Sequence, residues 1–263
     1  MSNLKYSNVL CLKWGSGYSP EYVNRLYRGV KANSNRKIRF VCVTDDAEGL
    51  DEGIDIQPFP EAPPGWKYSW PNIFVKLMVF RDGFAGLEGT TLFLDIDQII
   101  TGSIDDFFDY RPGEFCIIRN WLEWRKRIFK GLPKIGNSSC FRFEAGRMNH
   151  VYEKFLAEMD KAVDQRYFRT EQAFLTHAVG LENVNWWPGG WVQSFKRSCM
   201  LPFPLNLCIM PRPPRNAKIL CFHGRPNPPD AIKGYKGRHL NAWVKPCPWV
   251  DEMWSGEYSR KSC

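Results

Sequence analysis

Two short, apolar runs near the start of the chain flank a segment with helical spacing. Residues 8–13 (NVLCLK) and 38–44 (IRFVCVT) have the length and apolar character of buried strands. Between them, residues 20–33 repeat apolar side chains at helical spacing. Ser19 can cap this helix, and Pro20 suits its first turn. A strand, a helix and a second strand in this order open a parallel sheet, so the sequence predicts an α/β fold.

The remaining elements continue this pattern up to a proline-rich stretch. We expect further strands at 54–58, 90–95, 98–102, 114–118, 138–143 and 217–222, and helices at 72–82, 147–160 and 170–179. Residues 202–229 hold eight prolines and are expected to be mostly loop. No internal repeat or low-complexity linker interrupts the 263 residues, which predicts a single domain with two subregions.

Composition indicates the cellular compartment of the protein. No apolar run reaches the roughly 20 residues of a membrane span, and the N-terminus is typical of a first buried strand rather than a signal peptide. Nine cysteines occur without a CxxC pair, several of them inside apolar runs, which favours reduced thiols over a disulfide framework. We therefore expect a cytoplasmic protein, with a peripheral place on the inner face of a membrane as a further option.

Positive charge is concentrated in one segment. The net charge is +8, and residues 111–147 alone hold nine Lys or Arg against three Glu. Such a segment suggests an anionic partner, which could be a phosphate, an acidic glycan, a membrane surface or a nucleic acid. A solvated basic face without a partner explains it equally well.

The strongest chemical signal is a pair of carboxylates at the end of an apolar strand. Residues 90–95 (TTLFLD) lead into Asp95-Ile96-Asp97. Ligands of open α/β sheets bind at the carboxyl ends of strands, and alternation would put Asp95 and Asp97 on one side of an extended backbone. Two such oxygens suit Mn²⁺ or Mg²⁺ bound to a diphosphate, whose charge the metal stabilises as a bond to it breaks. A solvated turn is the alternative.

Several motifs stand in the order found in one enzyme family. They are Lys76-Leu77 with Phe80, Asp95-Ile96-Asp97, Ile104-Asp105-Asp106-Phe107-Phe108, Asn137-Ser138-Ser139, Glu171-Gln172, and His223-Gly224 followed by a proline-rich loop. In this order the sequence resembles the GT-A-fold glycosyltransferases, in particular family 8, the glycogenin and lipopolysaccharide glycosyltransferase group. The resemblance covers roughly residues 8–230. It departs from the family at Glu171, where the family has Asp, and after His223, where the family's lysine is missing and Arg225 or Asn227 stands nearest.

The resemblance implies a GT-A-like α/β domain with a mostly parallel central sheet, and an enzyme that uses a nucleotide-sugar, in particular a UDP-sugar. It divides the chain into a nucleotide-sugar-binding half (1–105), an acceptor half (106–232) and a C-terminal tail (233–263). Transfer would retain the anomeric configuration. The acceptor would be a glycan, a lipid-linked molecule or a protein, and residues 119–127 (RNWLEWRKR) could contact it or could form a surface helix.

The resemblance also implies roles for individual residues. Asp95, Asp97 and His223 would hold the metal, although a histidine at a strand end is often a core residue. Glu171, Gln172 and Lys76 would act near the transferred sugar and phosphate, although Lys76 could be a surface lysine with a buried stem. The residues expected to bind the nucleotide-sugar are Lys13, Trp14, Tyr22, Thr44, Asp45, Lys76, Asn137, Gly224 and Arg225.

Two other function classes remain open at this point. A nucleotidyltransferase would use the same metal and carboxylates, but Gly15-Ser16-Gly17 is a thin match to its glycine-rich phosphate loop. A non-catalytic basic module that binds nucleic acid or another anionic polymer would explain the charge of residues 111–147, but it leaves the strand that runs into Asp95 unexplained.

Overall fold

A computed structural model describes most of the chain. The described residues are 7–63, 66, 73–121, 134–164, 166–168 and 170–255. They divide into two compact units, neither continuous in sequence. The first unit comprises Met1–Pro20, Arg36–Asp95 and Asp106–Trp187, and the second comprises Glu21–Asn35, Ile96–Asp105 and Pro188–Cys263. The division into donor and acceptor halves at residue 105 concerns function and stays a prediction.

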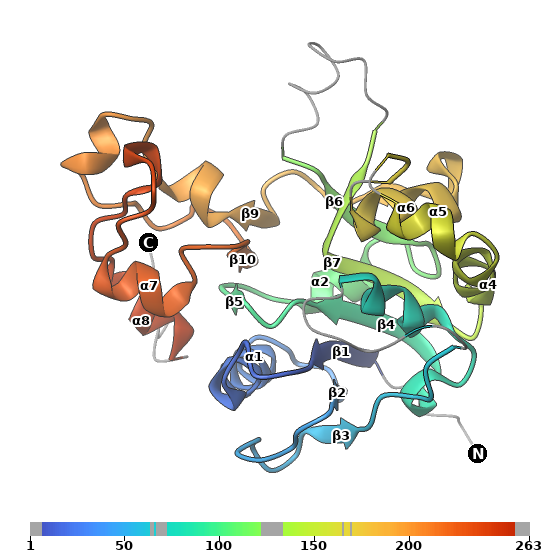
Figure 1. Cartoon of the computed structure of the whole chain (residues 1–263). Coiled ribbons are helices and arrows are strands. Elements are labelled where there is room, and N and C mark those ends of the chain that lie inside the picture. Colours follow the sequence, from blue (N-terminus) through green and yellow to red (C-terminus); the bar gives the residue numbers. More distant parts are fainter. Residues whose placement is uncertain are drawn as a thin grey trace. The chain divides into compact units, whose positions relative to one another are not determined.

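The first unit is built on a seven-stranded sheet in the order β3-β2-β1-β4-β7-β6-β8 (Figure 1). Its strands are β1 Ser7–Lys13, β2 Ile38–Thr44, β3 Asp55–Gln57, β4 Gly89–Leu94, β6 Cys116–Arg119, β7 Gly136–Ala145 and β8 Asn185–Trp186. Strands β3, β2, β1 and β4 run parallel, β7 is antiparallel to both neighbours, and β8 is parallel to β6. The predicted α/β fold with a mostly parallel sheet is confirmed.

The strand order creates a switch point between β1 and β4. From β1 the chain proceeds to β2 and then β3 on one side, and β4 is added on the other side of β1. At such a point the connections leave in opposite directions, which opens a crevice at the carboxyl ends of the two strands. These ends are Lys13 in β1 and Leu94 in β4.

Helices and aromatic side chains complete the first unit. Its helices are the 3-10 helices η1 Ile73–Phe80, η2 Phe84–Gly86 and η3 Leu181–Asn183, and the α-helices α2 Asp105–Asp109, α4 Asn149–Ala157, α5 Met159–Val163 and α6 Glu171–Val179, of which α2 begins at the last residue of the second unit. Helices α4, α5 and α6 gather near β7 in Figure 1. Between them and the sheet, Phe93 stacks on Phe141 at 4.6 Å between ring centroids, and Phe80 lies 4.9 Å from Phe143. Aromatic burial of this extent stabilises the core and holds η1 against the sheet.

Two predicted helices differ in detail from the structure. Residues 73–80 form a 3-10 helix rather than an α-helix, and six of its eight side chains are buried. Packing of this short element on several sides therefore outweighs the poorer hydrogen-bond geometry of a 3-10 helix. The helix predicted at 147–160 begins at Asn149 and breaks at Glu158, so α4 and α5 share what the periodicity indicated as one helix.

The second unit is built on a small sheet in the order β5-β10-β9. Its elements are α1 Pro20–Ala32, which begins at the last residue of the first unit, the strands β5 Gln98–Ile100, β9 Val192–Ser194 and β10 Ile219–Cys221, the π-helix η4 Phe195–Cys199, the 3-10 helices η5 Leu205–Leu207 and η6 Leu240–Ala242, and the helices α7 Pro228–Lys233 and α8 Pro248–Trp254. Strand β10 is antiparallel to β5 and parallel to β9. The central strand β10 thus fixes the residues that follow it beside those that follow β9.

Two expectations from composition can be compared with the structure. All eight cysteines in the described part of the chain are free, and Cys11, Cys42, Cys140 and Cys221 are buried, as small apolar residues would be. None of the helices in the described residues is long and apolar enough to cross a membrane.

Candidate active site

Three charged side chains from three elements meet in the first unit. The Lys76 ammonium, on η1, lies 2.7 Å from Asp95 Oδ1 and 2.9 Å from Asp95 Oδ2. It also lies 3.9 Å from Glu171 Oε1, at the start of α6. All three are mostly withdrawn from water, with side-chain exposures of 13%, 21% and 9% respectively. An ammonium shared by two carboxylates leaves a net negative charge at the end of β4.

A change of register in β7 brings Ser138 to the same place. Ile117 and Ile118 of β6 pair with Phe141 and Asn137 of β7, so residues 138–140 are left over on β7. Bulges of this kind redirect side chains next to active sites. Here the Ser138 hydroxyl donates a 2.5 Å hydrogen bond to Glu171 Oε1, which fixes one oxygen of that carboxylate.

The same bulge holds two further predicted residues. The Ser138 N–H donates to Gln172 Oε1 at 3.4 Å, and the Ser139 N–H donates to Asn137 Oδ1 at 3.1 Å. The Asp95 N–H donates to the Ser139 carbonyl at 2.9 Å, which ties the end of β4 to the bulge. The structure therefore brings together Lys76, Asp95, Asn137, Glu171 and Gln172, which are up to 96 positions apart in the sequence.

Four other predicted residues lie at the carboxyl ends of β1 and β2. Lys13 and Thr44 are register partners at the last position of the two strands, and both are buried. The Asp45 carboxylate accepts the Gly15 N–H at 2.9 Å and 3.2 Å, so it closes the loop that follows β1. Trp14 packs edge-on against Phe59 with 6.4 Å between ring centroids. These side chains lie beside the switch point, where an α/β sheet binds ligands.

The two aspartates of the DxD motif do not share an extended strand. Strand β4 ends at Leu94, and residues 96 and 97 form a turn. The expectation that alternation places Asp95 and Asp97 on one side is therefore wrong, because alternation requires extended backbone. Asp95 belongs to the first unit and Asp97 to the second.

In the second unit the ladder between β5 and β10 brings Asp97 close to His223. The Phe222 N–H donates to the Asp97 carbonyl at 3.2 Å, one step beyond the last strand pair. His223 is the next residue, and its Nε2 lies 2.6 Å from Ser194 Oγ, at the end of β9. Burial, together with the positive charges of Lys196 and Arg197, lowers the pKa of His223 from 6.5 to about 4. The imidazole is therefore neutral at pH 7, which is the form that binds metals.

Basic residues surround the loop after His223. The Lys196 ammonium donates to the His223 carbonyl at 2.7 Å and would lie 3.7 Å from a Cβ on Gly224, which has a φ of +61°. A cavity of about 200 Å³ is lined by Lys196, Arg197 and Arg225, together with Met200, Pro226, Asn241 and Ala242. Burial and Arg197 lower the pKa of Lys196, whereas the Asp97 carboxylate raises it. Three cations around a small cavity make a site for an anion such as phosphate.

Lys196 and Arg197 are functional candidates that the sequence did not reveal. The resemblance pointed to Arg225 as the cation nearest the missing family lysine. Arg225 does line the cavity, where it also lies 3.3 Å from Asp230. The only local signal for the other two was a Lys-Arg pair after β9, and the pairing of β9 with β10 is what places it beside His223.

The structure gives one predicted nucleotide-binding residue a packing role. Tyr22 lies on the buried face of α1 in the second unit and is 8% exposed. Its ring packs against Trp254, with 5.2 Å between centroids. These contacts account for the aromatic side chain without a nucleotide, and its role in binding the base stays a prediction.

The predicted basic face also changes in one respect. Arg142, counted in the segment 111–147, is fully buried in β7 and contributes nothing to a surface. Pairing of β7 with its neighbours buries the Arg142 side chain, and a charge count along the sequence does not show which residues are buried. Residues 122–133, which include most of the Trp- and Arg-rich stretch at 119–127, lie outside the described residues.

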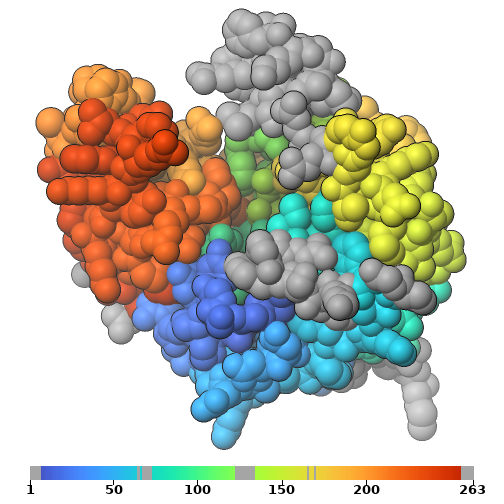
Figure 2. All heavy atoms as spheres, in the orientation of Figure 1, coloured from blue at the N-terminus to red at the C-terminus, as the bar shows by residue number. Residues whose placement is uncertain are grey.

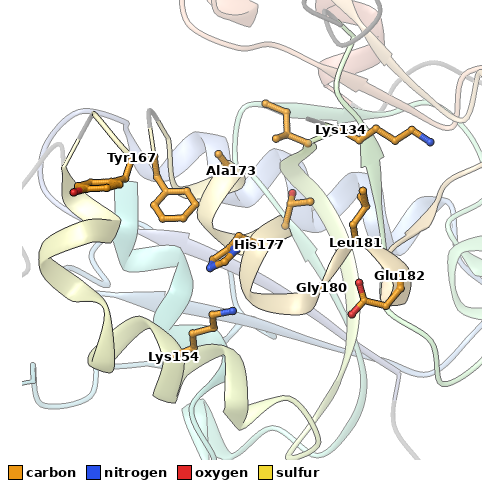
Figure 3. Close-up of a pocket in the computed structure, with 11 residues that line it drawn as sticks. Lys134, Lys154, Tyr167, Ala173, His177, Gly180, Leu181 and Glu182 are labelled. Atoms are coloured by element: carbon orange, nitrogen blue, oxygen red, sulfur yellow. The ribbon is translucent and has the colours of Figure 1, made fainter. Parts of the chain in front are cut away.

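A larger cavity of about 540 Å³ lies along α6 (Figure 3). Its lining includes Lys154, Tyr167, His177 and Glu182. His177 Nε2 lies 3.7 Å from Glu158 Oε2. None of the residues predicted for the site lines this cavity, although Glu171 and Gln172 begin the same helix. It is therefore separate from the polar cluster around Asp95.

Acid is expected to destabilise the protein through His223. A folded-state pKa of about 4 lies below the ordinary value of 6.5, so the unfolded chain binds a proton that the folded protein resists. Stability is therefore lost as the pH falls from 6.5 to 4, by about 3 kcal/mol. Urea denaturation in EDTA at several pH values measures this loss. His223→Asn should remove that part of the pH dependence, and equal slopes for variant and parent would contradict it.

The donor set can be tested for its fit to a divalent metal. No group of three His, Cys, Asp or Glu side chains within the described ranges is arranged to hold an ion. Asp97 and His223 nevertheless lie close together in the second unit, and Asp95 is two positions from Asp97. Two carboxylates and a neutral imidazole suit Mn²⁺. The Lys76 ammonium at 2.7 Å also shows that Asp95 attracts a cation. By donor type alone, and without an arranged cluster in the described residues, these side chains suit the metal.

Comparison with known proteins gives a fold and no close relative. No family model matches the sequence, and no curated protein matches it. Among solved structures, galactosyltransferase LgtC in complex with donor and acceptor sugar analogs aligns over 95% of each chain, with a TM-score of 0.59 and 14% identity. Glycosyltransferase GlyE of Streptococcus pneumoniae TIGR4 in its apo form aligns over 96% of this chain and 64% of its own, with a TM-score of 0.55 and 12% identity.

A third similar structure is the bifunctional glycosyltransferase WbbM, of which the chain spans about half. The alignment covers 87% of this chain and 47% of WbbM, with a TM-score of 0.59 and 12% identity. Identities of 12–14% show a shared fold and leave substrates undetermined. The chain has the GT-A-like fold of these glycosyltransferases.

Proposed function

We propose that the protein is a metal-dependent glycosyltransferase that moves a hexose from a nucleotide-sugar, in particular a UDP-sugar, to a glycan, a lipid-linked molecule or a protein. The observation that carries the proposal is the convergence of Lys76, Asp95, Ser138 and Glu171 at the carboxyl end of β4, beside the switch point of the sheet. This is where a GT-A-like sheet offers a ligand site, and the fold is one that several glycosyltransferases share.

We propose that the donor occupies two regions of the chain. Lys13, Trp14, Thr44 and Asp45 would receive the nucleoside at the ends of β1 and β2. The Gly224 backbone and the cations of Lys196, Arg197 and Arg225 would receive the diphosphate. Cations that contact the leaving phosphate stabilise the charge it gains as the sugar departs.

Asp95, Asp97 and His223 would hold Mn²⁺ or Mg²⁺. When bound, the metal would act as a Lewis acid that neutralises charge on the diphosphate. The Ser138 hydroxyl orients the Glu171 carboxylate through the 2.5 Å hydrogen bond, and the Lys76 ammonium partly neutralises the charge of that carboxylate. Glu171 and Gln172 would then contact the hydroxyls of the transferred sugar, and a positively charged sugar forming in the reaction would be stabilised by the carboxylate.

Ligand-induced stabilisation tests the proposal. We expect UDP with Mn²⁺ to raise the melting temperature by about 5 °C, because a ligand at a hundredfold excess over its Kd adds about 2.7 kcal/mol to the folded state. The measurement compares UDP, GDP and their sugars with Mn²⁺ and with EDTA. Asp97→Asn should abolish the Mn²⁺-dependent part of the shift, whereas Asp82→Asn, at an exposed position, should leave it intact.

Two outcomes would count against the proposal. Strong, salt-dependent binding to DNA or RNA without any nucleotide-sugar shift would favour a basic binding module. Release of inorganic diphosphate rather than UDP from a sugar donor would favour a nucleotidyltransferase.

A further inference from the structure

The segment from 202 to 210 in the second unit has its polarity reversed. Its sequence is PFPLNLCIM, without a charged residue. Asn206, its only amide, is 3% exposed, whereas Phe203, Leu205, Ile209 and Met210 are 39–54% exposed. A loop adapted to water buries its apolar side chains and exposes its polar ones. This loop does the opposite.

Hydrogen bonds hold the reversal in place. Asn206 Nδ2 donates to the carbonyls of Leu240 and Trp243, at 2.8 Å and 3.0 Å. The Ile209 N–H donates to the Leu205 carbonyl at 2.9 Å, which closes a turn within the segment. Leu240, in the facing turn, is itself 48% exposed. Asn206 thus joins two turns that both carry exposed apolar side chains.

We name this set of side chains the apolar patch; its members are Phe203, Leu205, Ile209, Met210 and Leu240. Figure 2 shows the orange part of the chain, around residue 200, at the surface of the molecule. The other large apolar side chains that are exposed among the described residues are spread over several elements of the first unit, from Ile56 to Leu181. A group of exposed apolar residues is typical of a surface that binds a protein, a membrane or a ligand.

Positive charge predominates in the sequence on either side of the apolar patch. Residues 196–245 hold ten Lys or Arg against one Asp. Arg212 and Arg215 follow the patch and are exposed, and Arg238 precedes Leu240 and is exposed as well. The Lys236 ammonium lies 5.2 Å from the Trp243 ring, whose backbone carbonyl binds Asn206. Cations therefore flank the apolar side chains along the chain on both sides.

We propose that the apolar patch and the surrounding cations dock the protein on the surface of an anionic phospholipid bilayer. Apolar side chains that enter the boundary between headgroups and acyl chains gain burial, and nearby Lys and Arg are attracted to anionic headgroups. A second copy of the chain fits less well. In a symmetric dimer the exposed arginines next to the patch, Arg212, Arg215 and Arg238, would meet the same arginines of the second copy.

Vesicle co-sedimentation tests the proposal without nucleotide or acceptor. The full chain is mixed with vesicles of phosphatidylcholine alone or of phosphatidylcholine with phosphatidylglycerol. We expect binding only to the anionic vesicles, weakened by salt. The variant Phe203→Ser, Leu205→Ser, Ile209→Ser should bind at least about tenfold more weakly. Arg212→Gln, Arg215→Gln, Arg238→Gln should bind about tenfold more weakly and show a smaller salt dependence.

A matched control replaces exposed apolar residues elsewhere. Leu156→Ser, Val163→Ser, Leu181→Ser removes three side chains of similar exposure from the first unit and should bind vesicles as the parent does. Melting temperatures of all variants should match the parent, since each replaced side chain is exposed. Equal vesicle binding by the patch variant and the control would overturn the proposal. So would a dimer in sedimentation equilibrium that forms without lipid and is lost in the patch variant.

Because this test contains no donor, its outcome is independent of the proposed transferase activity. If UDP with Mn²⁺ raises the melting temperature but the protein does not bind anionic vesicles, the proposed function stands and the membrane proposal is refuted. The reverse result would keep the membrane inference alone.

Discussion

Asp95→Asn is expected to lower the rate of UDP release from the preferred sugar donor by at least about a hundredfold. Asparagine keeps the shape of the side chain and removes the charge that Lys76 contacts at 2.7 Å. A neutral amide is a weaker ligand for a divalent metal than a carboxylate, and stabilisation of the leaving phosphate is worth two to three orders of magnitude, roughly, in comparable sites. The measurement is kcat/KM for UDP release, with the donor that gives the largest thermal shift.

Asp82→Asn provides the matched control for Asp95→Asn. Asp82 is an exposed aspartate of the same unit, and its backbone N–H, rather than its carboxylate, donates to Asn149 Oδ1. It should leave kcat/KM unchanged. Turnover like the parent's in Asp95→Asn, with an unchanged Mn²⁺ requirement, would refute the assignment of the metal to Asp95.

Lys76→Met separates the roles within the cluster. Removing the ammonium leaves Asp95 and the buried Glu171 without their shared positive charge, so the two carboxylates repel each other. If Lys76 only balances that charge, then Lys76→Met combined with Asp95→Asn should be more stable than Lys76→Met alone. Turnover of the double variant cannot be used for the second role, because Asp95→Asn lowers it by itself. If Lys76 contacts the donor, Lys76→Met should also reduce the thermal shift that UDP gives in EDTA, where no metal is bound at Asp95.

The sequence predicted the part of the site that is carried by strand ends. An apolar strand that runs into Asp95 and a parallel pair that ends at Lys13 and Thr44 place these residues at one sheet edge, whatever the loops do. The motif order added Asn137, Glu171 and Gln172, and the structure brings these to Asp95. Most strands were predicted within about two residues because their apolar runs are short and clearly bounded.

The parts that failed depend on register or on local turns. Strand pairing, which a sequence does not display, puts Lys196 beside His223 and leaves residues 138–140 over in β7. The turn at residues 96 and 97 defeated the alternation argument, because an apolar run cannot show where extended backbone ends. The charge count along the sequence treated Arg142 as a surface cation, because it does not show which side chains strand pairing buries.

Arg142→Met is expected to cost about 3 to 5 kcal/mol of folding stability. The Arg142 side chain is fully buried in β7. Its guanidinium donates to the carbonyls of Phe107 at 2.5 Å and Glu114 at 3.0 Å, and also to those of Tyr110 and Arg111. Methionine is of similar length but donates nothing, so it would leave these carbonyls without a donor. A buried carbonyl without a hydrogen-bond donor destabilises the folded state, and this substitution removes the donor from several carbonyls at once.

The guanidinium holds the connection between α2 and β6 mostly through backbone oxygens, with one further contact to Cys116 Sγ at 3.4 Å. Burial lowers its pKa, and the nearby Cys116, Glu144 and Glu114 oppose that shift. A planar group with five N–H donors can span four carbonyls, and an ammonium cannot. Arg142→Lys should therefore recover only part of the loss, even though it keeps the charge. A full recovery would mean that charge, rather than the geometry of the donors, stabilises this segment.

Arg147→Met is the control for both substitutions at Arg142. Arg147 is exposed in the turn that follows the same strand, so its replacement should change stability by less than about 0.5 kcal/mol. Urea denaturation followed by circular dichroism measures all three variants. A loss in Arg142→Met no larger than that in Arg147→Met would contradict the structural role. Because β7 also carries Asn137 and Ser138, a large loss should be accompanied by a weaker UDP shift, since a loosened strand no longer holds Glu171 in place.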